Sequence, residues 1–158
     1  MSQREVKFMQ AAVDLAREGM LEGRGGPFGC VIVKDNVIIG SGSNSVTSHN
    51  DPTAHAEVVA IRNACKALNH FQLTGCELYT SCEPCPMCLG AIYWARPSVV
   101  YFANTREDAS AIGFDDSLIY EELNIPLEKR TIKTIQLQIP DATAVFDEWR
   151  RNPNKTVY

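Results

Sequence analysis

The sequence predicts an α/β domain in which helices cover a central sheet. Segments with the apolar, β-branched character of strands alternate with segments of helical periodicity, which is the pattern of this fold class. A chain of 158 residues is long enough to bury one core. No internal repeat, low-complexity tract or linker divides it, so we expect a single domain over residues 1–158.

The chain begins with a predicted helix and a predicted hairpin. The helix runs from Gln3 to about Glu18, where a glycine-rich stretch ends it. Phe28–Val33 and Val37–Ser41 are apolar runs joined by Asp35 and Asn36, two residues suited to a tight hairpin turn. The helix is expected to bury the apolar residues at helical spacing, which are Val6, Met9, Val13, Ala16 and Met20.

The middle of the chain alternates again between helix and strand. A polar loop from Ser43 to Thr53 precedes a second helix, which opens at His55 and buries Val58, Ile61, Cys65 and Leu68. Glu77–Ser81 is a third predicted strand. Pro86 stands where a third helix begins, because the first helical position does not need an N–H donor.

The remaining elements complete the alternation. Ser98–Ala103 is a fourth predicted strand, Thr131–Ile139 a possible fifth, and Thr143–Arg150 a last helix.

Composition points to a protein of the cytoplasm with a small-molecule substrate. The residues after Met1 lack the apolar region of a signal peptide, and no apolar run approaches the roughly 20 residues of a membrane span. The six cysteines are therefore expected to stay reduced. The net charge is −4 and basic residues cluster only near Lys129 and Arg150, so we expect no nucleic-acid partner.

Two short motifs carry the chemistry. His55-Ala56-Glu57 is followed thirty residues later by Pro84-Cys85-Pro86-Met87-Cys88, which together match the H-x-E…P-C-x-x-C signature of zinc deaminases. One imidazole and two thiolates hold the ion and leave a position for water, whose pKa falls to about 7. A carboxylate that is not a ligand, Glu57, is free to move protons.

Other interpretations of the cysteines explain less of the pattern. An iron–sulfur run would need a fourth cysteine after Cys88, where the chain has Leu-Gly-Ala-Ile. A redox Cys-x-x-Cys pair or a non-catalytic zinc module has no use for Glu57. The remaining cysteines are predicted to be buried structural residues, with Cys82 near the site: Cys30, Cys65, Cys76 and Cys82.

Three segments resemble bacterial guanine deaminases of the cytidine deaminase-like superfamily. They read PTAHAEV over 52–58, LYTSCEPCPMCLGAIYWAR over 78–96 and GFDDS over 113–117, and the resemblance covers nearly the whole chain. It implies a three-layer α/β/α sandwich around a five-stranded mixed sheet. It also implies a homodimer whose C-terminal segments, about 131–158, are exchanged.

The resemblance assigns roles to particular residues. His55, Cys85 and Cys88 would hold one zinc ion per subunit, and Glu57 would shuttle protons while metal-activated water attacks carbon 2 of guanine. Xanthine and ammonia would leave.

The implied base-binding residues come from several parts of the chain. Asp116 is similar to a second acidic residue that contacts the base or relays protons, although its neighbour Asp115 is an alternative. Phe28 could equally be a core strand residue, Asn44 a turn residue and Trp94 a core residue. Trp94 and Tyr158 would close the site of the partner subunit. The whole implied set is Phe28, Asn44, Ala56, Trp94, Asp116 and Tyr158.

The nearest rival function keeps the zinc chemistry and changes the substrate. A tRNA adenosine deaminase shares both zinc motifs but needs a basic RNA-binding face. The last predicted helix instead mixes Asp147 and Glu148 with Arg150 and Arg151. Cytosine, cytidine and aminated triazines remain open, because the base is chosen by the shape of its site.

Overall fold

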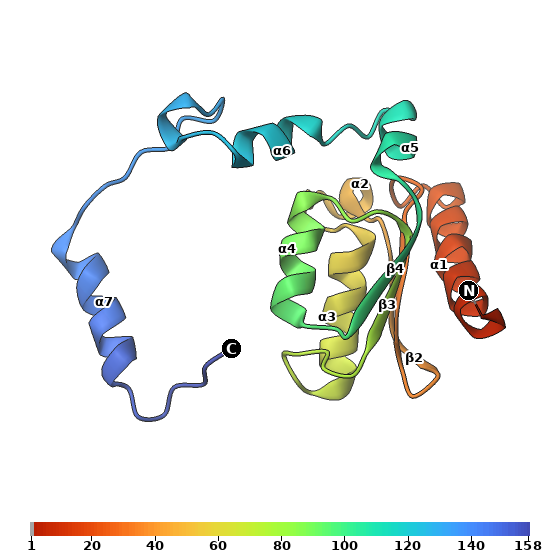
Figure 1. Cartoon of the computed structure of the whole chain (residues 1–158), viewed down its shortest axis with the longest axis horizontal. Helices are drawn as coiled ribbons and strands as arrows, with labels where there is room; N and C mark the ends of the chain where they lie inside the picture. The colour runs from red at the N-terminus through yellow and green to blue at the C-terminus, as the bar shows by residue number, and fades with distance from the viewer. Residues whose placement is uncertain (1) are drawn as a thin grey trace. The chain divides into compact units, whose positions relative to one another are not determined.

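A computed structural model describes residues 2–158 of the chain. The chain forms two compact units, and the boundary between them in the sequence falls between Asp116 and Ser117. We call residues 2–116 the sheet unit and residues 117–158 the tail unit. Figure 1 labels their helices and strands in chain order.

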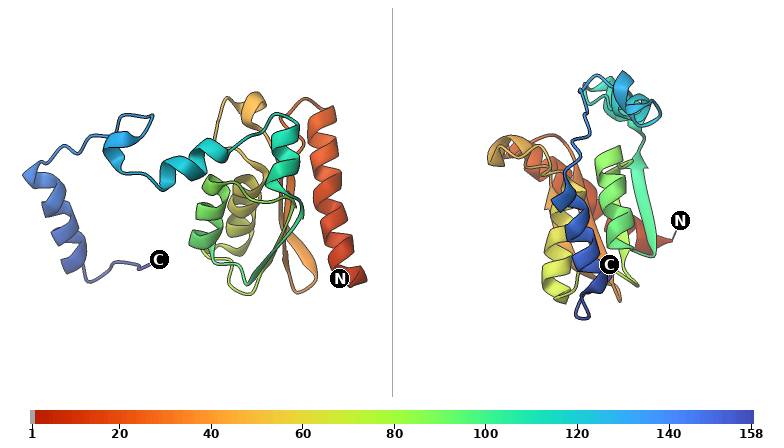
Figure 2. Two further views of the ribbon diagram at one scale, coloured as in Figure 1. Left: turned by 45° about the horizontal axis from the view of Figure 1, so that its top comes forward. Right: turned by 90° about the vertical axis from the view of Figure 1, so that its left-hand side faces the viewer.

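The sheet unit has three layers. Its mixed sheet has the strand order β2-β1-β3-β4, with β1 antiparallel to both of its neighbours and β3 parallel to β4. Helix α1 covers one face, and α3 and α4 cover the other (Figures 1 and 2). The predicted α/β/α class is therefore confirmed. The elements are α1 (Gln3–Leu21), β1 (Gly29–Lys34), β2 (Val37–Ser43), α3 (Ala56–Leu68), β3 (Glu77–Cys82), α4 (Pro86–Ala95) and β4 (Val99–Asn104).

The expected fifth strand is wrong for this chain by itself. Within residues 2–158 the sheet has four strands, and the segment 131–139 is irregular. The alternating pattern of this segment would place its apolar side chains on one face of a strand. A strand forms, however, only where a neighbouring strand pairs with its backbone N–H and C=O groups. No described strand pairs with this segment.

Several short helices lie where periodicity gave no signal, because each spans two turns or fewer. They are α2 (Val46–His49), inside the predicted loop, α5 (Arg106–Ala111), α6 (Ser117–Leu123) and the 3-10 turn η1 (Leu127–Lys129). Thr105 caps α5 through a reciprocal bond pattern with Asp108, which lets so short a helix begin sharply.

The hairpin turn between β1 and β2 is as predicted. Asp35 and Asn36 have φ values of 49° and 65°. Two consecutive residues in this region give the turn whose twist matches the flanking strands.

Helix α1 buries a face that only partly matches the predicted one: Ala16 is buried and Met9 packs at the edge of the core, but Val6 and Met20 do not belong to it. Phe8, Ala12, Ala16 and Gly19 are buried, whereas Val6 and Met20 are about half exposed. Small residues are buried here because the backbones of α1 and β1 come very close. A Cβ on Gly29 of β1 would lie 2.1 Å from the carbonyl oxygen of Ala12.

Helix α3 uses the same device on the opposite face of the sheet. Cβ atoms added to Gly40 and Gly42 of β2 would lie 2.5–2.6 Å from Ala64 and from the carbonyl oxygen of Ala56. The buried stripe of α3 is accordingly Ala56, Glu57, Ala60 and Ala64, and the predicted Ile61, Cys65 and Leu68 pack at its flank. The close contact between Gly42 and Ala56 fixes the start of α3 against the sheet.

The tail unit has no buried core of its own. Helix α7 (Pro140–Arg151) begins three residues before the predicted one, with proline at its first position. No residue from 117 to 158 is buried. Large exposed apolar side chains include Ile132, Ile135, Leu137, Ile139, Phe146, Trp149 and Tyr158.

None of the helices within residues 2–158 has both the length and the apolar character that crossing a bilayer requires.

Candidate active site

The residues of the two motifs lie at the starts of two neighbouring helices. His55 is the N-cap of α3 and Cys85 the N-cap of α4, and neither cap is satisfied by its own side chain. Glu57 and Cys88 lie in the first turns. The positive ends of both helices therefore point toward one place, where they favour thiolate and carboxylate ligands.

The spacing of three of these side chains fits a tetrahedral zinc ion. The Sγ atoms of Cys85 and Cys88 are each 3.5 Å from Nδ1 of His55. Zinc bound at about 2.1 Å by nitrogen and about 2.3 Å by sulfur, at tetrahedral angles, would separate those atoms by roughly 3.6 Å. Among the described residues, the group that could hold a metal ion contains these three and no fourth ligand.

The two thiols differ in acidity. A hydrogen bond from Cys88, helped by His55, lowers the pKa of Cys85 to about 4. The pKa of Cys88 is raised, first by its bond to Cys85 and then by burial. The bond to Cys85 also raises the pKa of His55. A metal ion binds cysteine as thiolate, so the lowered pKa of Cys85 favours metal binding at this site.

Glu57 lies beside the three ligands and is held separately from them. Its side chain is buried, and its Oε1 accepts a hydrogen bond of 3.1 Å from the Thr80 hydroxyl. Its Oε2 lies 3.3 Å from Sγ of Cys88. Burial is the main reason that the pKa of Glu57 is raised, which brings the carboxyl group closer to the range in which it can both accept and donate a proton.

The other cysteines are structural, as predicted, with one partial exception. Cys30, Cys76 and Cys82 are buried, while Cys65 is only half-buried. The Cys82 thiol donates to the carbonyl oxygen of Thr105 at 3.4 Å and stands outside the metal-binding group.

Phe28 lies at the edge of the core. It contacts the loop that contains Phe114, a neighbour that the sequence did not predict. The ring packs against the cluster that contains Ala56 and meets the ring of Phe114 edge-on, with centroids 4.9 Å apart. A Cβ on Gly26 would lie 2.8 Å from the Phe114 ring, so a larger residue at this position would displace that ring. Phe28 is half-buried, which leaves part of its ring open.

Asn44 is buried just after β2, and its amide oxygen is already engaged. Oδ1 accepts from the backbone N–H groups of Gly26 (3.3 Å) and Val46 (3.2 Å). This fixes the amide orientation and turns the NH₂ group away from those contacts. The expected donor and acceptor pair is thus reduced to a donor.

Asp116 lies in the segment after α5, within range of the charge of Cys85. It is half-buried, and its pKa is raised by burial and then by the charge of Cys85, whereas the side chain of Asp115 is exposed. Gly113, with φ of 96°, makes the turn that leads from α5 into this segment.

Ala56 is fully buried, so its methyl group belongs to the core. Its backbone N–H lies in the first turn of α3, where helical bonding leaves donors without an intrahelical partner.

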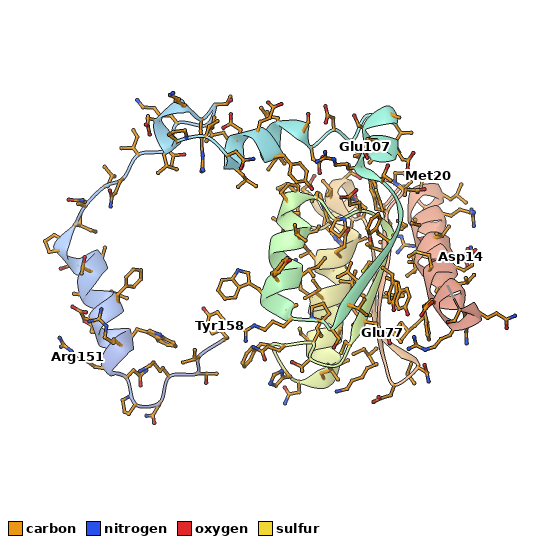
Figure 3. The ribbon with its side chains drawn as sticks, in the orientation of Figure 1. Asp14, Met20, Glu77, Glu107, Arg151 and Tyr158 are labelled. Carbon is orange, nitrogen blue, oxygen red and sulfur yellow. The ribbon has the colours of Figure 1, made fainter. Side chains whose placement is uncertain are left out.

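Trp94 and Tyr158 lie on the surface of their respective units, each 64 % exposed. The alternative that Trp94 is a core residue of this chain is wrong. Figure 3 labels Tyr158 at the end of the tail unit.

The motifs and their geometry agree with a known family. Residues 2–104 match the family described as the cytidine and deoxycytidylate deaminase zinc-binding region. This chain belongs to that deaminase family.

Individual members of the deaminase family match much more of the chain. Guanine deaminase from Bacillus subtilis is 58 % identical over 96 % of this chain and 97 % of its own. A tRNA-specific adenosine deaminase from Aquifex aeolicus is 44 % identical over 90 % of this chain and 91 % of its own. The X-ray structure of the Bacillus subtilis guanine deaminase covers 100 % of this chain and 99 % of its own, with 56 % identity and a TM-score of 0.95.

Two residues at this deaminase site had no role in the sequence analysis. Thr80 reads as an ordinary strand residue, and Phe114 stands in a segment noted only for its glycine and acidic residues. Thr80 stands in a predicted buried strand, where a hydroxyl group needs a hydrogen-bond partner, and this was the available signal. The sequence has no local pattern that identifies Glu57 as that partner.

Proposed function

We propose that this deaminase hydrolyses guanine to xanthine and ammonia. The observation that carries the chemistry is the buried Glu57, which lies beside a three-ligand metal group without belonging to it. The relative that is 58 % identical, a guanine deaminase, supports guanine as the substrate.

Glu57 would do the proton work of the reaction. Zinc held by His55, Cys85 and Cys88 would act as a Lewis acid that makes water nucleophilic near neutral pH. Glu57 takes a proton as water adds to carbon 2 of the base, and gives it to a ring nitrogen. It then takes the second proton from the hydroxyl group now on carbon 2 and gives it to the departing amine as the C–N bond breaks, so guanine and water become xanthine and ammonia.

The base would be held by a ring, a donor and a carboxyl group. Phe28, supported by Phe114, offers its face for stacking. The Asn44 NH₂ group and the Ala56 backbone N–H can donate to acceptors on the edge of the base, and Asp116 can accept from its N–H groups.

We also infer a homodimer in which the tail units are exchanged. Apolar side chains of the tail unit, such as Ile135, Leu137 and Ile139, are exposed within one chain and need cover. Those three alternate with polar residues, as in a strand with one buried face. A partner's segment 131–139 would supply a fifth strand beside the edge strand β4, and the partner's Trp94 and the partner's Tyr158 would enclose the base.

A reducing compartment such as the cytoplasm would suit this site, because the ligand thiols at Cys85 and Cys88 must not form disulfides.

The test is ammonia release from a panel of substrates, with metal analysis of the same protein. We expect one zinc per chain, and turnover of guanine far above that of adenine, cytosine and cytidine. A site built to bond one edge leaves buried polar groups unpaired when the substrate lacks that edge. Faster deamination of adenosine in a tRNA anticodon than of guanine would overturn the proposal.

A further inference from the structure

The two oxygens of the Glu57 carboxyl group have different neighbours. Oε1 accepts from the Thr80 hydroxyl at 3.1 Å, and Oε2 lies 3.3 Å from Sγ of Cys88. Oε2 is therefore the oxygen beside the metal-binding group. Oε1 is turned away from it, toward the sheet.

The contact at Oε2 cannot hold the carboxyl group once the site is loaded. A cysteine that binds zinc is a thiolate, which has no proton to donate. The bond from Thr80 does not depend on the protonation of the ligands. Of the two side-chain contacts described for the Glu57 carboxyl group, the hydrogen bond from Thr80 is therefore the one that can persist when metal binds.

Thr80 is itself firmly placed. It lies in β3 between Cys30 of β1 and Phe102 of β4, and its side chain is 1 % exposed. It shares a face of the sheet with Leu78, which packs in the core cluster below α3. Threonine is stiff at its first side-chain torsion, so the direction of the hydroxyl is set by the strand.

The identity of this residue is informative because the position is apolar. A hydroxyl buried in such surroundings is unfavourable unless it is hydrogen-bonded, and valine has nearly the same shape without that requirement. The hydroxyl at position 80 finds its partner on another element, across the layer between β3 and α3.

We propose that Thr80 is a positioning residue for proton transfer: it anchors Oε1 of Glu57 so that Oε2 faces the reacting atoms. This inference rests on the proposed deaminase function. Without the anchor, the carboxyl group can rotate, and the buried Oε1 loses its donor. The step that Glu57 performs should slow, whereas base binding by Phe28 and Asn44 should not change.

Steady-state kinetics on guanine with the zinc-loaded, full-length protein test the proposal through Thr80→Val and Thr80→Ser. Thr80→Val should lower kcat roughly tenfold to a hundredfold, as expected for losing a hydrogen bond to a charged group. KM and zinc content should stay within about threefold of the unchanged protein. Thr80→Ser keeps the hydroxyl and should recover most of kcat.

Ser81→Ala is the matched control, because it removes a neighbouring buried hydroxyl that accepts from the Gly29 N–H at 3.0 Å and makes no described contact with Glu57. It should lower the melting temperature and leave kcat within about threefold. Full kcat in zinc-loaded Thr80→Val would overturn the inference, as would equal losses in the valine and serine variants.

Failure of the proposed function would look different from failure of the inference. If the unchanged protein released no ammonia from guanine, the substrate assignment would be wrong, and the same three variants would be compared on whichever base of the panel it deaminates. Thr80 would still be tested there, through kcat against KM.

Discussion

Glu57 and Asp116 are two carboxyl groups near the same cysteine pair, and burial raises the pKa of both. They differ in how they are held. Glu57 is deeply buried and tied to β3, whereas Asp116 is half-buried in a loop that follows a glycine turn. This contrast suits a proton shuttle for the first and base recognition for the second.

Glu57→Gln should leave zinc content near one per chain and lower kcat by roughly 10² to 10⁴ or more. The amide keeps the size of the side chain but cannot cycle between proton acceptor and donor. Metal analysis and ammonia release on one preparation check this. Substantial activity in the variant would remove Glu57 from the mechanism.

Asp116→Asn should lower kcat/KM for guanine roughly tenfold to a hundredfold with zinc retained, because an amide cannot replace a charged acceptor. Asp115→Asn is the matched control and should have a small effect. The reverse ranking in kcat/KM would transfer the role to Asp115.

Phe114→Ala should raise KM for guanine about threefold to tenfold with little change in kcat, since the edge-on ring pair is worth about 0.5–1.5 kcal/mol. The KM of Phe114→Leu should lie between those of the unchanged protein and Phe114→Ala, because leucine keeps bulk beside Phe28 without the aromatic contact. A kcat loss at constant KM would place Phe114 in the chemical step instead.

The metal ligands could be predicted from sequence because Cys85 and Cys88 have the local spacing of two thiolates that share one ion, and because His55-Ala56-Glu57 and this cysteine pair together match a described signature. The partners of Glu57 and Phe28 could not. Thr80 and Phe114 reach them across the fold, and a contact between distant residues leaves no periodic trace. The limited acceptor role of Asn44 likewise depends on which backbone N–H groups the folded loop brings to it.

At the scale of helices and strands, one ion pair joins the start of α1 to the sheet. Arg4 donates from two nitrogens to Glu77 at 2.9 Å, and the Tyr79 hydroxyl donates to the same carboxylate. Figure 3 shows Glu77 between the sheet and α1. These donors lower the pKa of Glu77, with Arg4 as the main cause.

The lowered pKa gives stability a definite pH dependence. The ionised Glu77 stabilises the fold above its unfolded pKa of about 4.3, and this contribution is lost as the pH falls through the lower pKa of the folded state. Because both side chains are partly exposed, Glu77→Gln should cost about 0.5–1 kcal/mol at pH 7, or roughly 1–4 °C in melting temperature.

Thermal melts from pH 7 down to pH 3 check this prediction, and the deficit of Glu77→Gln should shrink below pH 4. Asp14→Asn, in an exposed pair with Arg17, is the control and should melt like the unchanged protein throughout. A deficit that stayed constant with pH would mean that packing, rather than charge, accounts for the effect.

The helices and strands of the sheet unit could be predicted from their patterns, but the buried faces were less predictable. In α1 the sequence offers apolar side chains on more than one face. The choice of Phe8 and Ala12 over Val6 and Met20 depends on how closely the helix backbone approaches Gly29. The segment 131–139 has a strand pattern but no strand partner in its own chain.

At the scale of the whole molecule, the tail unit stands out because none of its large apolar side chains is buried. Its exposed apolar residues and the exposed Trp94 of α4 are the basis of the proposed exchange. If the exchange occurs, subunits should be complementary in a way that ordinary dimers are not.

Deleting residues 152–158 should lower activity with zinc retained, because closure over the base is lost. A heterodimer of this truncated chain with a full-length Glu57→Gln chain should be active. It contains one intact zinc site enclosed by the other chain's tail. Activity well above both parent homodimers is the expected result, measured on heterodimers isolated with two different tags.

Isolated heterodimers as inactive as both parents would mean that each tail acts within its own chain. The truncated homodimer serves as the control for zinc content and melting temperature, so that loss of folding is separated from loss of closure.

The residues proposed for the chemistry and those proposed for the choice of base occupy different parts of the chain. The ligands and Glu57 lie between residues 55 and 88, at two helix starts fixed to the sheet. Phe28, Asn44, Phe114 and Asp116 lie outside that span, in or beside loops that meet at Gly26. A protein engineer could therefore graft loops from deaminases of other bases at 24–28 and 113–116 while leaving the metal centre intact. New specificities would then be reached without first losing the catalyst.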